Sequence, residues 1–460
     1  MTTCSRVPTR ARETEALRAK ASHVRLPRCL ARVAPSLACA GALAAAAPGG
    51  SALAAAFQLR ENTAAGLGTS FAGVGSAAET PDTVSNNPAG MVRLPGLQVY
   101  LGGSIIIPSA TFRGTATDRF GRVISGDTER DAGNAAVVPF GHVAYRVTPD
   151  LSVGLSITSP YGLATYYGPG WAGRYLADKT DLRTIDFNPA VAYRIAPWLS
   201  VGAGLSVQTA RAVFSSSINS STLTGRLLPL QDGLFNLRGD DVSVGYNVGV
   251  LIEPRAGTRI GLTYRSRIQH DFEGQTTYNL PAALLANPLL RARFRNGPGR
   301  AKLVLPDTAG VSVTQEFGPR WTGYLDVNWT NWSLFKRLGA YRDTGELITN
   351  TPQNYRDSFF VALGASYRAS DWLTLRAGTA FDKTPVRDAF RTARVPDEDR
   401  YWLSVGASAR LAPNMVLDAG YAHLFLPDAR INETSTTGDV LRGRYDAGID
   451  LLTVGLRSSF

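Results

Sequence analysis

Residues 199–208 read LSVGAGLSVQ, and every second position of this stretch carries a hydrophobic residue. The apolar face is made of Leu199, Val201, Ala203, Leu205 and Val207. The opposite face carries only Ser, Gly and Gln. Residues 401–410 (YWLSVGASAR) repeat this alternation, and a period of two indicates a β-strand with one apolar face. We therefore expect strands with an apolar face and a small or polar face.

Short and long connections alternate along the chain from about residue 97. The six short joins carry turn residues and lie near 148–150, 196–198, 253–257, 317–319, 369–371 and 411–414. The seven long segments lie roughly at 114–135, 159–180, 217–240, 275–300, 334–354, 384–400 and 429–442. This layout, with tight turns at one end and long loops at the other, is typical of outer-membrane barrels. We expect an all-β fold, a 14-stranded antiparallel transmembrane β-barrel over residues 97–460.

The ends of the expected strands are rich in aromatic residues, as the interfacial girdles of a membrane barrel would be. The alternative is that they are core aromatics. The residues concerned are Tyr166, Tyr167, Trp171, Trp198, Trp321, Trp329, Trp332, Trp372, Tyr401 and Trp402. The final alternating stretch ends in Phe460, which resembles the terminal signature of barrels inserted by the barrel assembly machinery.

Residues 1–54 are expected to be a secretory signal peptide that is removed. A basic stretch ends at Arg32, an Ala/Leu-rich run follows, and Ala52-Leu53-Ala54 offers a cleavage site. Cys39 allows a lipoprotein signal as the alternative. This leader holds all three cysteines and +6 of the formal charge of +11, so we expect neither thiolate chemistry nor a nucleic-acid partner.

Residues 55–96 break the alternating pattern, because Gly and Pro recur there and leave room only for short helical pieces. A barrel of fourteen strands encloses an aqueous lumen unless something fills it. We expect this segment to fold into the lumen as a hatch, or plug. The alternative is a periplasmic linker.

Two of the long segments are unusually apolar for solvated loops. They could pack on each other as a lid, or they could offer a hydrophobic landing site with arginines nearby for a carboxylate. The expected docking residues are Leu228, Leu230, Leu234 and Phe235 in the third loop, and Leu284, Leu285, Leu289, Leu290 and Phe294 in the fourth.

Several short motifs, in order, resemble the FadL family of outer-membrane long-chain fatty acid transporters. They include Phe57-Gln58-Leu59, Asn87-Pro88-Ala89, Ser159-Pro160-Tyr161-Gly162, Leu262-Thr263-Tyr264-Arg265-Ser266 and Trp329-Thr330-Asn331-Trp332-Ser333. The resemblance covers essentially all of residues 55–460. It implies a barrel closed by an N-terminal hatch, a docking groove between the third and fourth loops, an inner pocket, and release through a gap in the wall.

The resemblance also implies roles for particular residues. Asn87-Pro88-Ala89 matches the hatch motif that lies against the gap, and Pro160 and Gly162 fall on the third strand, where a proline cannot donate a ladder hydrogen bond. The expected ligand-binding residues of hatch and gate are Phe57, Leu59, Asn87, Pro88, Ala89, Pro160 and Gly162. Family members of the fatty acid type carry a basic pocket residue after an Ala-Arg-Ala stretch, but here Val213 to Ser216 follow Ala210-Arg211-Ala212.

Together with the barrel, the resemblance implies passive uptake of hydrophobic molecules, above all long-chain fatty acids, by a monomer in contact with outer-membrane lipid of a Gram-negative bacterium. An aromatic hydrocarbon channel of the same family, a general porin and a barrel enzyme are the alternatives. The last would need a catalytic histidine, and His142, His270 and His423 lie in no catalytic motif. We expect no catalytic activity, no cofactor and no metal site.

Overall fold

The alternating stretches form strands in the computed structural model, which describes Met1 and residues 56–225 and 231–460. Their bounds are β1 (Leu97–Thr117), β2 (Ala136–Arg146), β3 (Leu151–Thr158), β4 (Gly162–Tyr166), β5 (Lys179–Ala196), β6 (Leu199–Ile218), β7 (Gly233–Arg255), β8 (Thr258–Arg265), β9 (Ile268–Asn279), β10 (Gly297–Leu305), β11 (Thr308–Phe317), β12 (Trp321–Thr330), β13 (Arg337–Arg342), β14 (Leu347–Pro352), β15 (Ser358–Arg368), β16 (Leu373–Asp382), β17 (Arg400–Ala412), β18 (Met415–Phe425), β19 (Ala429–Thr434) and β20 (Val440–Ser459).

These segments form one antiparallel sheet that closes on itself, because β1 pairs with both β2 and β20. Six barrel strands are each interrupted once, so that two segments continue one another beside the same neighbours. The split strands are β3/β4, β8/β9, β10/β11, β12/β13, β14/β15 and β18/β19. When each is counted once, the described residues form the fourteen-stranded barrel expected from the connections.

The outer wall of the barrel is apolar, as the alternation predicted. Leu205 and Leu403 point outward and are 51% and 58% exposed, whereas the inward-pointing Ser206 is fully buried. Exposed aromatic residues mark both ends of this belt, with Trp198, Trp321 and Trp372 near the tight turns and Phe359, Tyr401 and Phe425 toward the loops. None of the helices in the described part of the chain is long and apolar enough to span a membrane.

Other aromatics that the sequence assigned to the girdles lie inside the barrel instead. Tyr167 stacks on Trp171 with the ring centroids 3.7 Å apart, and both side chains are buried. Trp332 and Trp402 are also buried. The girdle prediction is wrong for these residues, because Tyr167, Trp171 and Trp332 lie in connections that are packed inside and Trp402 is at an inward-facing position of β17.

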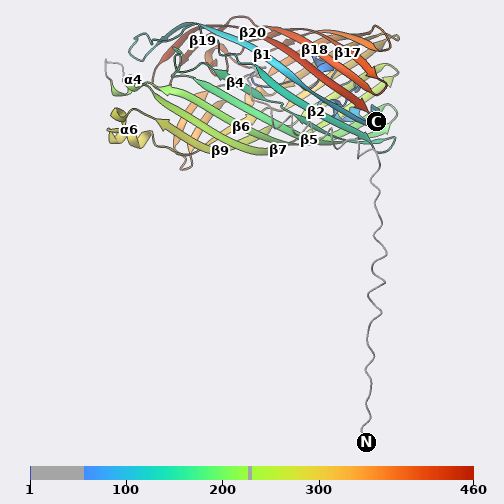
Figure 1. Ribbon diagram of the computed structural model, residues 1–460, viewed down its shortest axis with the longest axis horizontal. Coiled ribbons are helices and arrows are strands. Elements are labelled where there is room, and N and C mark those ends of the chain that lie inside the picture. Colours follow the sequence, from blue (N-terminus) through green and yellow to red (C-terminus); the bar gives the residue numbers. More distant parts are fainter. Residues whose placement is uncertain (2–55, 226–230) are drawn as a thin grey trace.

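The two ends of the barrel differ as the connections predicted. Tight turns and the C-terminus lie at one end, and the long loops with α4 (Ser220–Thr224) and α6 (Pro288–Arg293) lie at the other (Figure 1). The loop end also carries α5 (Ala282–Leu285), η2 (Trp332–Leu334) and η3 (Asp388–Phe390). The longest strands reach far into it, and β7 alone has 23 residues. Parts of the expected long loops are therefore strands that extend beyond the apolar belt.

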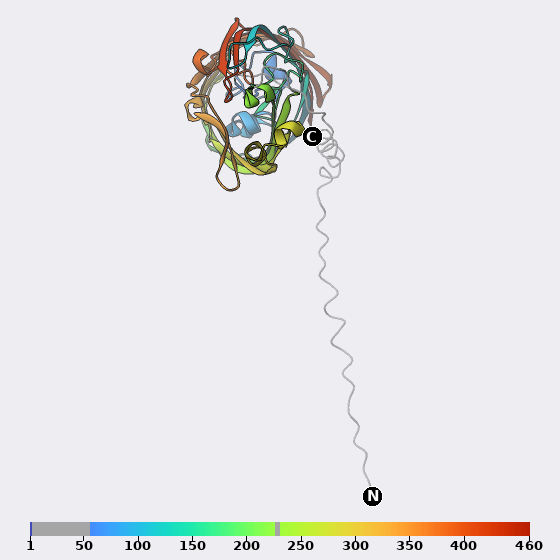
Figure 2. The same cartoon turned by 90° about the vertical axis from the view of Figure 1, so that its left-hand side faces the viewer.

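Residues 56–96, which we call the luminal segment, fold inside the ring of strands (Figure 2). They contain α2 (Ala64–Leu67), α3 (Thr83–Asn86) and η1 (Pro88–Arg93). Thr63 caps α2 by accepting a hydrogen bond from the backbone N–H of Gly66, and Asn87 caps η1 in the same way through Ala89. The expected signal peptide and the docking residues Leu228 and Leu230 lie outside the described residues.

Inward-facing glycines of the wall allow the luminal segment to approach the strands closely. A Cβ atom on Gly406 would lie 2.8 Å from the Cα of Gly68, and one on Gly202 would lie 2.5 Å from the backbone N of Ala89. A glycine in a strand often marks such a close backbone approach. The small face that the sequence showed is therefore the surface on which the luminal segment packs.

Candidate functional site

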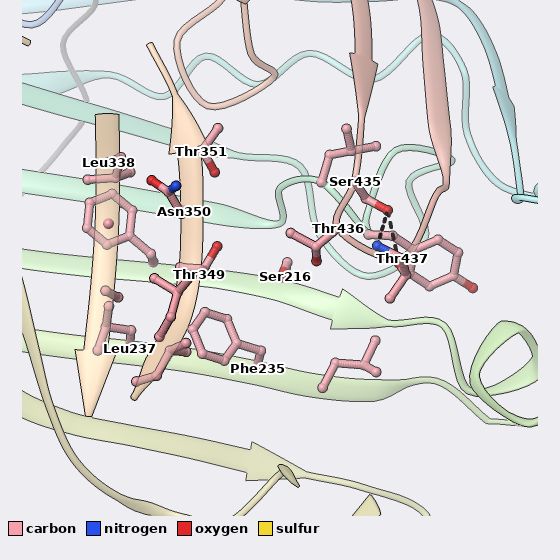
Figure 3. A pocket seen from close by; sticks show the side chains of 18 of the residues that line it. Ser216, Phe235, Leu237, Leu338, Thr349, Asn350, Thr351, Ser435, Thr436 and Thr437 are labelled. Atoms are coloured by element: carbon pink, nitrogen blue, oxygen red, sulfur yellow. Dashed lines mark hydrogen bonds between the residues drawn. The ribbon is translucent and has the colours of Figure 1, made fainter. Parts of the chain in front are cut away.

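A cavity of about 280 Å³ opens at the loop end of the barrel, and we call it the vestibule. Figure 3 shows Phe235 and Leu237 of β7 near Thr349, Asn350 and Thr351 of β14. The residues 435–437, which join β19 to β20, line the same cavity. The wall thus combines apolar rings and methyl groups with hydroxyl groups, which suits an amphipathic molecule.

The third and fourth loops contact each other beside the vestibule. Leu284 is buried against Ile218 and Leu280, and Phe235, Leu290 and Phe294 pack on this cluster, partly buried. Leu285 is 37% exposed and Leu289 is 80% exposed. Leu234 is also exposed, and both Leu234 and Phe235 belong to β7 rather than to an irregular loop. The expected docking residues therefore divide into a buried contact between loops and an exposed apolar rim.

A second, much smaller pocket lies deeper in the barrel and shares Phe214, Leu338 and Arg394 with the vestibule. Its volume is about 30 Å³, which is room for only about two water molecules. Phe57 of the luminal segment forms part of its wall. The Phe57 ring packs edge-on against Trp332, with centroids 4.6 Å apart. An acyl chain can enter this inner pocket only if the luminal segment or a loop moves.

Arg394 supplies the basic group that the sequence lacked after Ala210-Arg211-Ala212. Its guanidinium donates hydrogen bonds to the carbonyl oxygen of Ser215 at 3.0 Å and to that of Lys179 at 3.1 Å. It also lies 5.8 Å from the centre of the Phe214 ring. A cation therefore lies beside Phe214 and Ser215 of β6, and a residue far along the chain provides it.

The surroundings of Arg394 are electrostatically unusual. Burial lowers the pKa of Arg394, and the nearby carboxylates of Glu433 and Asp178 oppose that shift. Burial also raises the pKa of Glu433 to about 7, against the opposing effects of the Ala393 backbone N–H and of Arg394. Glu433 pairs in register with Leu441, beyond the apolar belt. The vestibule thus holds a partly buried cation next to Glu433, an acid whose pKa is raised to about 7.

The third barrel strand is interrupted at Ser159-Pro160-Tyr161. Its pairing with β2 ends at Ile157, and β4, which follows the break, pairs with β5. Among the strands that the structure describes, β4 has no partner on the side of β2. Pro160 has no N–H to donate, which explains why regular pairing ends here.

The luminal segment forms hydrogen bonds with the backbone at this break. The N–H of Leu59 donates to the carbonyl of Pro160 at 2.8 Å, and the N–H of Gly162 donates to the carbonyl of Phe57 at 2.9 Å. Gly162 also accommodates Leu59, because a Cβ at position 162 would lie 2.9 Å from the Leu59 Cδ1. The structure therefore brings together four of the residues expected at the hatch and gate.

Asn87-Pro88-Ala89 lies elsewhere, against β6 and β7. The side-chain amide of Asn87 donates to the carbonyl of Gly75 at 2.6 Å and to that of Val250 at 3.1 Å. Pro88 and Ala89 press on Gly202, and Asn87 presses on Gly249. This motif holds the luminal segment to the wall and does not contact Pro160 or Gly162 directly.

A third cavity, of about 130 Å³, lies between the luminal segment and the wall, and Ser159, Pro160 and Tyr161 line it together with Leu59. Its lining includes polar side chains such as Arg265. The break therefore meets an internal space, and Phe57-Gln58-Leu59 lies between that space and the inner pocket.

The start of the luminal segment is anchored by charge. The backbone N–H of Ala56 donates to Asp397 at 2.9 Å, and Thr384 donates to the same carboxylate at 2.6 Å. Arg400 forms an ion pair with Asp397. These partners lie in or beside the loop that carries Arg394, so the start of the luminal segment is hydrogen-bonded to that loop.

The three histidines of residues 56–460 each have a partner. His142 contacts the carbonyl of Asn62 at 2.9 Å, His270 contacts Asp241 at 2.8 Å, and His423 contacts Asp450 at 2.8 Å. Ser243 also donates to Asp241, which places it beside the acid rather than at the imidazole. A Ser-His-Asp relay requires the hydroxyl to face the imidazole, so this geometry is not one.

Comparison with known proteins agrees with this geometry. The model of the family described as outer membrane protein transport protein (OMPP1/FadL/TodX) matches residues 45–460. A long-chain fatty acid transport protein of Salmonella typhi is 31% identical over 395 residues, which cover 82% of this chain and 89% of the relative.

Two solved structures share the fold. A Pseudomonas aeruginosa FadL homologue has a TM-score of 0.83 at 23% identity and covers 88% of this chain and 99% of its own. The toluene transporter TodX of Pseudomonas putida has a TM-score of 0.63 at 16% identity and covers 88% of this chain and 100% of its own. The chain therefore belongs to the FadL/TodX family of outer-membrane transport proteins for hydrophobic compounds, and it resides in the outer membrane.

Proposed function

We propose that this protein takes up long-chain fatty acids. The carboxylate would bind Arg394 while the acyl chain occupies the inner pocket, and the molecule would leave laterally through the break at Ser159-Pro160-Tyr161. The partly buried cation is the observation that carries the proposal, because a neutral hydrocarbon has no group that needs it. The vestibule, the inner pocket and the cavity at the break supply the apolar and amphipathic surfaces along the way.

The luminal segment would act as the hatch. It closes the inner pocket through Phe57 and is hydrogen-bonded to the break through Leu59, so a single displacement of residues 57–59 would enlarge the pocket and free the gap. No energy source is required, since the substrate moves down its gradient. The family consists of transporters, and we propose that this chain likewise has no enzymatic role.

Replacing Arg394 by Gln is expected to weaken oleate binding by about 10- to 100-fold, because a charge-assisted hydrogen bond contributes roughly 1.5–3 kcal/mol. Toluene binding is expected to stay within twofold. The measurement is ligand titration of the detergent-purified protein, followed by uptake of labelled oleate in cells that lack their own transporter. Arg394→Lys should retain most of the affinity, and Arg387→Gln, an exposed arginine of the same loop, should change nothing.

The competing reading is an aromatic hydrocarbon channel, which the aromatic lining around Phe57 and Phe214 would also suit. If toluene enters cells through this protein and oleate does not, and if Arg394→Gln leaves all uptake unchanged, that reading replaces fatty acid transport. Such a result would change the proposed substrate but not the conclusion that the protein transports hydrophobic compounds.

Oleate affinity is expected to fall as the pH rises from 6 to 8. Glu433, with its pKa raised to about 7, is largely protonated and neutral at the lower pH and negatively charged at the higher. The charged form would repel a carboxylate at Arg394 by roughly 1 kcal/mol, or about fivefold. An alkyl sulfonate, which stays ionised throughout, should show the same decrease. Glu433→Gln should remove it, and a decrease that persists in this variant would contradict the assignment.

A further inference from the structure

Three arginines stand side by side on the outer wall of the barrel. Arg113 of β1 pairs in register with Arg444 of β20, and Arg444 pairs in register with Arg430 of β19. All three side chains are exposed and point away from the lumen, whereas their neighbours Phe112, Tyr445 and Ile431 are buried inside. Residues directly opposite on adjacent strands have Cβ atoms about 5 Å apart, and like charges at this spacing destabilise the pairing. We call these residues the arginine row.

Acidic groups within the protein do not balance the arginine row. Asp428 lies 3.3 Å from Arg444, and Asp446 is exposed on the same face of β20. A fourth arginine, Arg442, lies next along this face and bonds to Asn432. Within the residues that the structure describes, the side chains of Arg113 and Arg430 have neither a hydrogen-bond nor an ion-pair partner. On this face β1, β19, β20 and Asp428 together carry four cations and two anions, a net positive charge. Asp131, in the loop that bridges to Thr111 of β1, accepts hydrogen bonds from the backbone N–H groups of Ala110 and Gly133.

On the opposite side of the barrel, three outward-facing arginines lie close to carboxylates. There Arg211 of β6 lies 3.9 Å from Asp240, its register partner on the adjacent strand β7, and Arg300 lies 3.3 Å from Glu273. Even Arg183, which faces Arg211, has Asp181 at 2.7 Å. Each of these three outward arginines thus has a carboxylate within 4 Å.

Arg238 of β7 and Arg337 of β13 are exposed and have no ion pair among the described residues, but neither faces a second arginine. The arginine row differs from both cases, because three arginines adjacent in register have only one close carboxylate, Asp428, among them. This arrangement points to a counterion from outside the chain.

The height of the arginine row above the apolar belt identifies that counterion. Phe425, in the aromatic girdle at the loop end, pairs in register with Gly448, four residues from Arg444. At roughly 3.4 Å per residue and a strand tilt near 40°, the row lies about 10 Å beyond the girdle. In the outer membrane this is the level of the lipid headgroups of the outer leaflet. Guanidinium groups bind phosphate with two parallel hydrogen bonds.

We propose that the arginine row is a binding site for the phosphate groups of an anionic glycolipid in the outer leaflet. One phosphate bridges Arg113 and Arg444, and a second, or the same one, contacts Arg430. The lipid holds together β1, β20 and β19, the strands at which the ends of the chain close the barrel. This site lies outside the lumen and is separate from the transport route.

The test uses the full-length protein in detergent and bisphosphorylated lipid A as the probe. Each arginine near an anionic lipid surface contributes about fivefold, so Arg113→Gln with Arg430→Gln should lower the affinity roughly 30-fold, and Arg430→Gln alone about fivefold. The matched control, Arg211→Gln with Arg300→Gln, should stay within twofold. An unchanged shift in gel mobility on heating verifies that each barrel is folded.

Three results would overturn the proposal. Equal losses in the double variant and in its control would mean unspecific charge attraction. Equal binding of dephosphorylated lipid A would exclude phosphate recognition. Competition by inorganic phosphate at the same concentration as lipid A would assign the row to a free anion instead of a lipid.

Discussion

A disulfide between positions 70 and 404 is expected to abolish uptake and reduction to restore it. Ser70 of the luminal segment and Ser404 of β17 are both buried, and their hydroxyl oxygens lie 2.7 Å apart. Cysteines at these positions would be within bonding reach, and no natural cysteine lies between residues 40 and 460. The bond would fix the luminal segment to the wall, so that neither the inner pocket nor the break could open. Uptake of labelled oleate with and without a reductant measures the effect, and we expect at least a 20-fold difference.

The matched control crosslinks the wall to itself. Ser104 of β1 and Thr453 of β20 also have their hydroxyl oxygens 2.7 Å apart, so paired cysteines there would form a similar bond without fixing the luminal segment to another strand. Uptake through this control should not depend on the reductant. Rapid uptake through the oxidised 70–404 variant, with the disulfide verified by mass spectrometry, would show that the luminal segment does not move during transport.

Closing the break in the third strand is expected to reduce uptake at least tenfold while the barrel still assembles. Pro160→Val would restore a backbone donor, and Gly162→Val would add a second β-branched residue that favours extended structure. The Cβ of the new side chain would lie 2.9 Å from Cδ1 at the flexible end of Leu59. Together they would allow the strand to continue past Ile157 and pair with β2. The measurement is oleate uptake, normalised to the amount of heat-modifiable protein in the outer membrane.

Pro189 provides the control for this variant. It lies within β5, opposite Leu155, in a strand that is not interrupted there. Pro189→Val should leave uptake within twofold of the natural protein. If the closed-break variant transports as well as this control does, the lateral route is wrong, and the substrate must pass along the barrel axis.

The sequence predicted the barrel well because its evidence is local and periodic. Alternation and turn residues are properties of neighbouring positions, so the strand starting at Leu199 and the turn before it could be recognised without a structure. Boundaries at the loop end were less accurate. The expected loop before residue 241 holds the first eight residues of β7, because a strand that extends above the membrane no longer needs apolar residues on its outer face.

Site residues could be predicted only where they belong to a short sequence motif. Phe57, Leu59, Pro160 and Gly162 could be named from the sequence, and they meet at the break. Arg394 could not be predicted, because its partners Ser215 and Phe214 lie on β6, far away in the sequence. Only folding brings them next to Arg394. The wall glycines were recognised as a lumen-facing surface, but their use as contact points for the luminal segment depends on pairings across the barrel.

Photocrosslinking with a fatty acid that carries a diazirine at its tail tests the route most directly. The substrate is added to cells that express the natural protein, and labelled peptides are mapped by mass spectrometry after irradiation. We predict labels at Phe235 and Phe294 in the vestibule, at Phe57 and Phe214 in the inner pocket, and at Ser159-Pro160-Tyr161 in the break. Labels that avoid the break and appear instead on η1, at the tight-turn end of the lumen, would contradict lateral release.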